Sequence, residues 1–509
     1  MTSTAPRPAP KGATALQHGS PGPSGRRWLI LAVVGLAQLM VVLDATIVNI
    51  ALPSAQRELG FSDGDRQWIV TAYSLAFGSL LLLGGRLADL VGRRLVFLTG
   101  VAGFAAASAL AGAAGSFSLL VGGRALQGMF GALLAPAALS LLNTTFTDAR
   151  ERAKAFGVYG AIAGTGGAIG LLLGGLLTEH LSWRWTLYVN LGFAALALAG
   201  GATLLRRTAP NRTARLDPPG ALLVSAGLFG VVYGLSNAVP HGWSSPMTWG
   251  FLVAGAVLIA AFAGWQRRAA HPLLPLRIVL DRDRGASFTA VVVAASGMFG
   301  VFLFLTYYLQ ATLHYSPVRT GLAFLPMIAA LVVSAQLATN GTLPRVGAKA
   351  AVPAGMALAA AGMVWLTGIG LQGGYASHIL PPLLVLGLGL GHVMPPAISL
   401  ATAGVVPADA GAASASVNTM QQIGGSIGTA LLNTLATSSA ARYVSGHGRG
   451  PASLAQAQLH SYTTAFWWSA GIFTLGLVVT GSLYRRRAAG TRQPDAATGS
   501  DPSGTVVHL

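Results

Sequence analysis

The sequence predicts an all-α integral membrane protein with fourteen transmembrane helices, arranged as two six-helix bundles plus two inserted central helices. Three observations predict this fold class. Hydrophobic residues make up 53% of the 509 residues and charged residues only 9%, whereas soluble proteins carry roughly 25% charged residues. Many stretches are long and apolar enough to cross a bilayer, which takes about 20 residues. Basic residues concentrate in alternate connecting segments, as the positive-inside rule requires.

The predicted spans follow one another along the chain with mostly short connections. The first span is too long for a signal peptide and carries Asp44, so we expect it to remain in the mature protein. The fourteen spans are 28–51, 67–84, 95–115, 118–141, 155–178, 185–205, 218–237, 247–265, 286–310, 320–340, 350–370, 379–402, 411–436 and 461–484.

The distribution of Lys and Arg predicts that both termini lie in the cytoplasm. With the N-terminus inside, cytoplasmic segments hold 25 of the 32 basic residues, outside loops hold 6, and Arg124 lies within a span. The formal net charge of +18 therefore reports orientation, and we expect no nucleic acid partner. The two ends, 1–27 and 485–509, are rich in small and polar residues, which predicts disordered tails.

A weak internal repeat divides the chain into halves. The segment Gly85–Arg94 follows the second span and Gly341–Lys349 follows the tenth, and both read G-x-L followed by a glycine and a basic residue. If the two segments correspond, bundles occupy 28–205 and 286–484, and 206–285 is a linker with two inserted helices. Many transporters consist of such repeated halves with a site between them.

Asp44 is the one carboxylate well inside a predicted span, and Arg124 is the one basic residue inside a span. A charge at the bilayer centre costs at least about 2.5–3.5 kcal/mol. Asp44 is therefore a protonatable group in a water-filled cavity, a member of a structural ion pair, or an acid close enough to the surface to be wet. The two residues lie at matching depth, which predicts electrostatic communication without requiring a direct salt bridge. A static pair remains the alternative.

Two further sets of residues are functional candidates. In the cytoplasmic loop 85–94, glycines permit a tight turn and charges can cap helices or lock the halves, although an ordinary basic loop would read the same. Its candidate gating residues are Gly85, Asp89, Gly92, Arg93 and Arg94. Polar side chains inside spans are candidates for a substrate cavity, although such groups also simply join neighbouring helices. They are Asn49, Gln127, Tyr307, Gln310, Asn418, Gln421 and Gln422.

The sequence predicts no cofactor, no metal site and no use of ATP. It contains no cysteine, so disulfides and thiolate metal sites are absent. A phosphate-binding loop needs G-x-x-x-x-G-K-[ST], and the only lysines, Lys11, Lys154 and Lys349, lack that context. Zinc motifs are also missing. Energy coupling is therefore expected to use an ion gradient.

Several motifs occur together in an order that resembles the drug:proton antiporter branch, with 14 spans, of the major facilitator superfamily. The resemblance covers nearly all of 28–485. The motifs are Leu43 to Pro53, Gly85 to Arg94, Arg124 to Gly128, Trp183-Arg184-Trp185 with Asn190, Tyr308 to Gln310 with Pro317, Gly321 and Pro326, and Asn418 to Gly425.

The fifth span matches the glycine-rich antiporter motif of this branch except at one position. The motif's glycines correspond to Gly157, Gly166, Gly170, Gly174 and Gly175, which are candidates for close helix packing. Leu171 stands where the motif has proline. Proline would kink the helix and leucine will not.

The resemblance implies a rocker-switch exporter of the inner (cytoplasmic) membrane that is expected to work as a monomer. Asp44 would bind a proton from outside and release it inside while an amphipathic drug or antibiotic leaves, and Arg124 would tune the proton affinity. The alternative is a proton-coupled symporter or a facilitator for a nutrient, metabolite or siderophore. A membrane enzyme or sensor would need a catalytic constellation or a soluble domain, and the sequence offers neither.

Overall fold

The computed structural model describes residues 24–146, 148–206, 217–270, 272–274, 276–403, 405, 410–448 and 450–485. In that part of the chain helix follows helix and no strand occurs. The predicted tails 1–27 and 485–509 lie almost wholly outside the described residues. The first half consists of α1 (Ser24–Leu59), α2 (Gln67–Val91), α3 (Arg93–Gly112), α4 (Phe117–Thr145), α5 (Ala149–His180) and α6 (Trp185–Leu204).

The inserted segment and the second half continue the same pattern. The inserted helices are α7 (Pro218–His241) and α8 (Pro246–Gln266), followed by the short α9 (Leu276–Val279). The second half consists of α10 (Arg282–Tyr307), α11 (Pro317–Leu337), α12 (Leu343–Val346), α13 (Ala348–Leu366), α14 (Leu380–Thr402), α15 (Ala410–His447) and α16 (Pro451–Leu483). The π-helical turns η1 (Tyr308–Thr312), η2 (Ala338–Thr342) and η3 (Tyr375–Ile379) adjoin α10, α11 and α14.

The structure confirms the all-α membrane fold class. A helix occupies each of the fourteen predicted stretches, and among the described residues eleven helices are long and apolar enough to cross a membrane. The helices α2, α5 and α15 are not among these eleven, and the count of fourteen spans and the domain division stay predictions.

Polar side chains fix the starts of several helices. Ser116, Asp217, Asp281 and Ser316 precede α4, α7, α10 and α11, and each accepts a hydrogen bond from a backbone N–H in the first turn. Such N-caps satisfy donors that have no partner within the helix. The predicted starts agree with the observed ones to within one residue at α4 and α7, and lie four and three residues late at α10 and α11.

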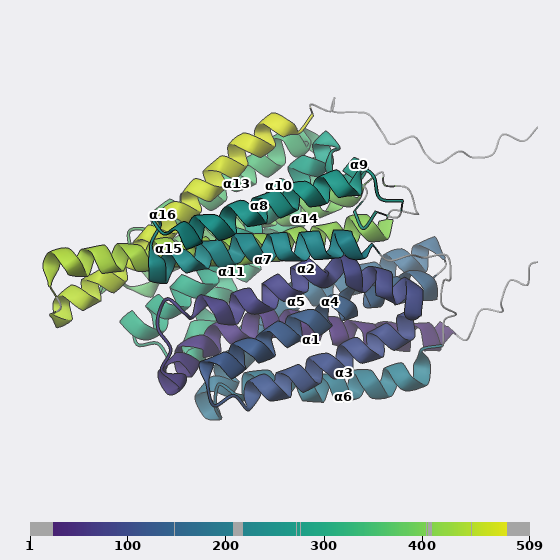
Figure 1. Ribbon diagram of the computed structural model, residues 1–509, viewed down its shortest axis with the longest axis horizontal. Coiled ribbons are helices and arrows are strands. Elements are labelled where there is room, and N and C mark those ends of the chain that lie inside the picture. The colour runs from purple at the N-terminus through teal and green to yellow at the C-terminus, as the bar shows by residue number, and fades with distance from the viewer. Residues whose placement is uncertain are drawn as a thin grey trace, which may run out of the picture.

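Figure 1 shows two groups of helices side by side, with α1–α6 below and most of α10–α16 above. The inserted pair α7 and α8 packs on itself and, through α7, against both α2 and α15. We call the end of the bundle with the start of α1 and the α2–α3 turn the basic end, and the other the opposite end. The start of α1 and the end of α16 both lie toward the right of the view, on the same side of the bundle.

The buried core shows how the halves meet. One cluster combines α1 residues near the opposite end, such as Ile47 and Leu52, with second-half residues such as Phe304 and Tyr308. A separate cluster near the basic end, which includes Val34 and Phe97, contains described residues of the first half alone. The halves are therefore joined at the opposite end and form separate cores at the basic end.

The predicted loop 85–94 is wrong in extent. Its residues continue α2 to Val91, because Leu, Ala and Arg are good helix formers. Only Gly92 breaks the helix, with φ 108°, a conformation that other residues rarely adopt. Gly347 has φ 73° at the corresponding turn before α13. This shared geometry supports the internal repeat.

The helices α15 and α16 extend well beyond their predicted spans. The α15 helix ends at His447 rather than near 436, and α16 begins at Pro451 rather than near 461. The extra turns carry polar residues, so apolar length could not reveal them. These turns protrude from the bundle at the left of Figure 1.

Candidate functional site

Asp44 and Arg124 form a buried ion pair inside the first half. The Arg124 guanidinium donates to Asp44 Oδ2 at 2.5 Å. Relative exposure is 0% for Asp44 and 2% for Arg124. The sequence predicted communication between the two groups, and the structure adds direct contact.

Three more side chains close a hydrogen-bond network around the Asp44 carboxylate. Gln127 and Asn190 donate to Asp44 Oδ1 at 2.9 and 2.8 Å. Both amides also donate to Ser108 Oγ, at 2.7 and 3.3 Å. The carboxylate thus accepts three N–H donors from α4 and α6, which suits its ionised form because an ionised carboxylate only accepts.

Arg124 has further partners besides Asp44. Its Nε donates to the carbonyl of Ile69 at 3.1 Å, and its guanidinium donates to Gln127 Oε1 at 2.7 Å. The guanidinium carbon lies 4.5 Å from the centre of the Tyr73 ring, a cation–π arrangement. Five helices, α1, α2, α3, α4 and α6, therefore meet at this cluster.

A proton on Asp44 would change the contacts that this cluster can make. Protonating Asp44 would remove its negative charge and turn one acceptor oxygen into a donor. Arg124 would then lose its ionic partner, and a buried charge without a partner is costly. Two buried atoms of the cluster, the Tyr73 hydroxyl and Asn190 Oδ1, have no hydrogen-bond partner among the described residues. Both atoms could form new hydrogen bonds if the cluster rearranged.

The sequence did not predict every member of this cluster. Gln127 was expected to line a substrate cavity, and the structure places it beside Asp44. Asn190 entered only as a motif landmark, and Ser108 and Tyr73 were not singled out. A polar residue on each apolar helix at one depth is the signal that could have found Ser108 and Asn190. Tyr73 acts through its ring, and no comparable pattern marks it.

The glycines of α5 allow close contact with two helices. A methyl group at Gly166 or Gly174 would lie 3.0 or 2.9 Å from Val42 or Ile47 of α1. At Gly175 it would lie 2.7 Å from the Pro317 carbonyl of α11. Gly170 packs against Thr46 in the same way. Gly157 lies within α5, and nothing more is described of its surroundings.

Leu171 takes part in the same contact between the halves. It is buried in an α5 that runs without a break from Ala149 to His180. Its carbonyl lies so close to Gly321 of α11 that a methyl group there would come within 2.5 Å. The α5–α11 contact therefore depends on Gly175 and Gly321, because each lies against the backbone of the other helix.

Arg66 joins the halves at the opposite end. Its relative exposure is 2%, and its Nε donates to Asn433 Oδ1 of α15 at 3.0 Å. Its guanidinium carbon lies 4.4 Å from the Tyr307 ring centre and 5.4 Å from that of Phe304. Asp63 is an ion-pair partner at 3.6 Å. We call Arg66, Asn433, Phe304 and Tyr307 the Arg66 cluster.

Other polar contacts support the same closure. The Tyr307 hydroxyl donates to Gln56 Oε1 at 2.5 Å, and Gln310 Nε2 donates to the Ile50 carbonyl at 3.0 Å. Glu179 accepts the backbone N–H of Val318 at 2.9 Å. Hydrogen bonds from the Ser316 side chain and from this N–H hold the pKa of Glu179 below its usual value.

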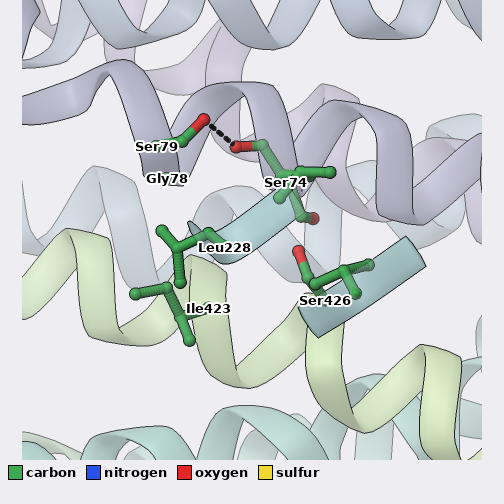
Figure 2. A pocket seen from close by; sticks show the side chains of 8 residues that line it. Ser74, Gly78, Ser79, Leu228, Ile423 and Ser426 are labelled. Atoms are coloured by element: carbon green, nitrogen blue, oxygen red, sulfur yellow. Dashed lines mark hydrogen bonds between the residues drawn. The ribbon is translucent and has the colours of Figure 1, made fainter. Parts of the chain in front are cut away.

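The facing sides of α2 and α15 carry polar groups toward the bilayer centre. Figure 2 shows Ser74 of α2 and Ser426 of α15 around a small pocket, with Leu228 of α7 beside them. Within the described residues the hydroxyls of Ser74 and Ser426 and Gln422 Oε1 are buried without a hydrogen-bond partner. Gln422 packs on Gly78, where a methyl group would lie 2.9 Å from its Cβ. The substrate-binding role expected for Gln422 stays a prediction.

The remaining candidates occupy separate places. Arg94 donates to the Ala202 carbonyl of α6 at 2.6 Å. Asn49 donates to the Ala45 carbonyl of its own helix at 3.1 Å. Asn418 and Gln421 lie on α15 and are partly buried. Gly85 and Arg93 lie near the α2–α3 turn, and the side chain of Asp89 is outside the described residues. The gating role of this segment stays a prediction.

One contact there was not predicted. Arg86 donates to the Pro272 carbonyl at 3.0 Å, in the segment that follows α8. The basic end of α2 is thereby tied to the inserted segment.

Comparison with known proteins gives a consistent result. The family model described as Major Facilitator Superfamily matches residues 34–429. A puromycin resistance protein of Streptomyces alboniger is 49% identical over 94% of this chain and 95% of its own length. A cephamycin export protein of Amycolatopsis lactamdurans is 38% identical over 84% and 88%. The crystal structure of an autoinhibited POT family peptide transporter matches with a TM-score of 0.66 at 16% identity, over 92% of this chain and 99% of that one, which shows the fold alone.

Proposed function

The chain belongs to the major facilitator superfamily, and from this premise we propose that it exports an amphipathic antibiotic or drug across the cytoplasmic membrane in exchange for protons. The substrate class is supported by the two relatives named above, one a resistance protein and the other an export protein for antibiotics. The buried Asp44–Arg124 pair is the observation that carries the proton-coupling part of the proposal.

The proposed cycle follows from the chemistry of the pair. In this cycle the described state is the one without the proton, in which the Arg124 guanidinium pairs with the Asp44 carboxylate. A proton from outside binds an Asp44 oxygen, and the ion pair breaks. Arg124 keeps the Ile69 carbonyl and Gln127 Oε1 as acceptors. Loss of the proton to the cytoplasm restores the pair, so protonation and conformation are linked because each cluster geometry fits one charge state.

The direction in which the protein sits in the membrane is inferred from the distribution of its basic residues. The basic residues predict that the basic end faces the cytoplasm. The halves then close on the outer side through the Arg66 cluster and the α5–α11 contact. They keep separate cores on the cytoplasmic side. The described conformation is accordingly proposed to be the one that takes up drug from the cytoplasm.

Expression in an efflux-deficient bacterial host tests this function. We expect the wild type to raise the inhibitory concentration of at least one amphipathic antibiotic in a panel that includes puromycin and a cephamycin. Asp44→Asn should lose that resistance when strains of matched membrane abundance are compared. Addition of a protonophore should restore drug accumulation in wild-type cells. Full resistance in the Asp44→Asn strain would contradict the proposed coupling.

A further inference from the structure

A small apolar cavity lies directly outward of the Asp44 cluster. Its walls continue the helix faces that hold the cluster: Val48 and Leu52 follow Asp44 on α1 by one and two turns, and Leu120 precedes Arg124 on α4 by about one turn. Leu187 precedes Asn190 on α6 by three residues, and Arg124 itself reaches the cavity. The cavity therefore lies inside the first half and separates the ion pair from the outer surface.

Trp183 and its neighbours close the outer end of this cavity. Trp183 has 4% relative exposure, and its indole N–H donates to Glu58 Oε2 at 2.6 Å. The Arg184 guanidinium lies 4.5 Å from the Trp183 ring centre and pairs with Glu58 at 3.1 Å. The Glu58 side chain is 50% exposed. From the outside inward, the order is a hydrated carboxylate, an indole, an apolar cavity and the ion pair.

An apolar cavity of this kind controls access of water. Apart from Arg124 and Thr186, its lining is aliphatic or aromatic. Apolar cavities stay dry, and hydrophobic constrictions in channels gate by losing water. A proton crosses such a space only when water fills it. In the described state the cavity would therefore insulate Asp44 from the outer side.

We propose that the proton reaches Asp44 from outside through this cavity, with Trp183 as the lid, and not through the cleft between the halves. The proposal rests on the proposed function. When the lid lifts, water enters, and a proton from the outer solution passes along this water to an Asp44 oxygen. The bond between Asp44 and Arg124 breaks, and the guanidinium keeps its charge. Proton and drug then use separate routes on the outer side.

Proton leak in proteoliposomes that contain a pH-sensitive dye tests the route. A polar group in the cavity favours water there, so Val48→Thr and Leu52→Asn should each raise drug-independent proton entry at least fivefold over the wild type. Adding Asp44→Asn should remove the leak, because the route ends at Asp44. Val301→Thr, the same change at a buried site of α10, is the matched control and should not leak. No leak in either cavity variant, or a leak that survives Asp44→Asn, overturns the proposal.

Thiol labelling gives a second readout that does not depend on the leak. The chain has no native cysteine, so Ala55→Cys on the cavity wall is the single target. A membrane-impermeant methanethiosulfonate added outside should label it at least tenfold faster when Trp183→Ala is also present, and at the unchanged rate with Trp183→Phe. Equal rates in all three proteins refute the lid. Absence of drug-driven proton movement in the wild type would instead refute the proposed function, so the two failures are distinct.

Discussion

The Asp44–Arg124 pair allows a test that separates a proton switch from a static structural pair. Asp44→Asn leaves the 2%-exposed Arg124 without its counter-ion, and Arg124→Met leaves the carboxylate with the two amide donors. Breaking a buried ion pair from one side costs about 3–5 kcal/mol, whereas replacing both partners is often nearly neutral. The double variant should therefore be more stable than either single variant, with a coupling energy of about 3 kcal/mol in a double-mutant cycle.

The unfolding free energy of each protein is measured by denaturant titration in detergent micelles, and transport is measured as drug efflux from proteoliposomes. We expect the double variant to regain stability without regaining transport, because no group remains to carry the proton. The wild type and the single variants complete the cycle. Recovery of transport together with stability would show that the pair is only structural.

Three further outcomes follow from the contacts between the halves. Gly175→Ala should lower resistance, because a methyl group 2.7 Å from the α11 backbone costs about 1–3 kcal/mol in strain. Gly192→Ala, at a site with free space, should leave resistance unchanged. Equal loss of resistance in both variants would contradict the importance of this contact. Arg66→Ala removes a cation–π contact worth about 0.5–2 kcal/mol. It should raise the rate at which an outside reagent labels a cysteine placed in α15 about tenfold, whereas Arg57→Ala, at an exposed site, should leave the rate unchanged. An unchanged rate in Arg66→Ala would show that the Arg66 cluster does not keep the two halves together. The pKa of Glu179 is lowered, so the stabilisation of the folded state by its carboxylate is complete above the usual glutamate pKa and is lost as the pH falls through the lowered pKa. The pH profile of transport between about 5 and 8 should therefore be the same in Glu179→Gln and in the wild type. A new pH dependence in that range would contradict the role given to Glu179.

Apolar length and loop charge predicted the helices and their order because both are set by the bilayer. Helix ends that carry polar residues were less predictable. The polar turns of α15 and α16 lie beyond the apolar runs, and the turn after α2 reduces to Gly92 because the preceding residues are helix formers. Where an N-cap such as Ser116 marks a start, the prediction agrees closely.

The residues of the candidate site also fall into those that the sequence predicts and those that it does not. Asp44 and Arg124 could be found because each is the single charge of its sign inside a span. Arg66 could not, because a basic residue in an outer loop appears solvated until the second half supplies Asn433 and Tyr307. Contacts between residues more than two hundred positions apart depend on tertiary packing, which no local pattern encodes.

Drug-driven proton movement in proteoliposomes distinguishes a proton-coupled exporter from an uncoupled one. With drug loaded on the cytoplasmic side of the protein and no pH gradient imposed, the wild type should move protons toward that side as drug leaves, and Asp44→Asn should move none. The proton signal should rise in proportion to drug flux. Drug efflux by the wild type without proton movement, or equal proton movement in Asp44→Asn, would contradict the account.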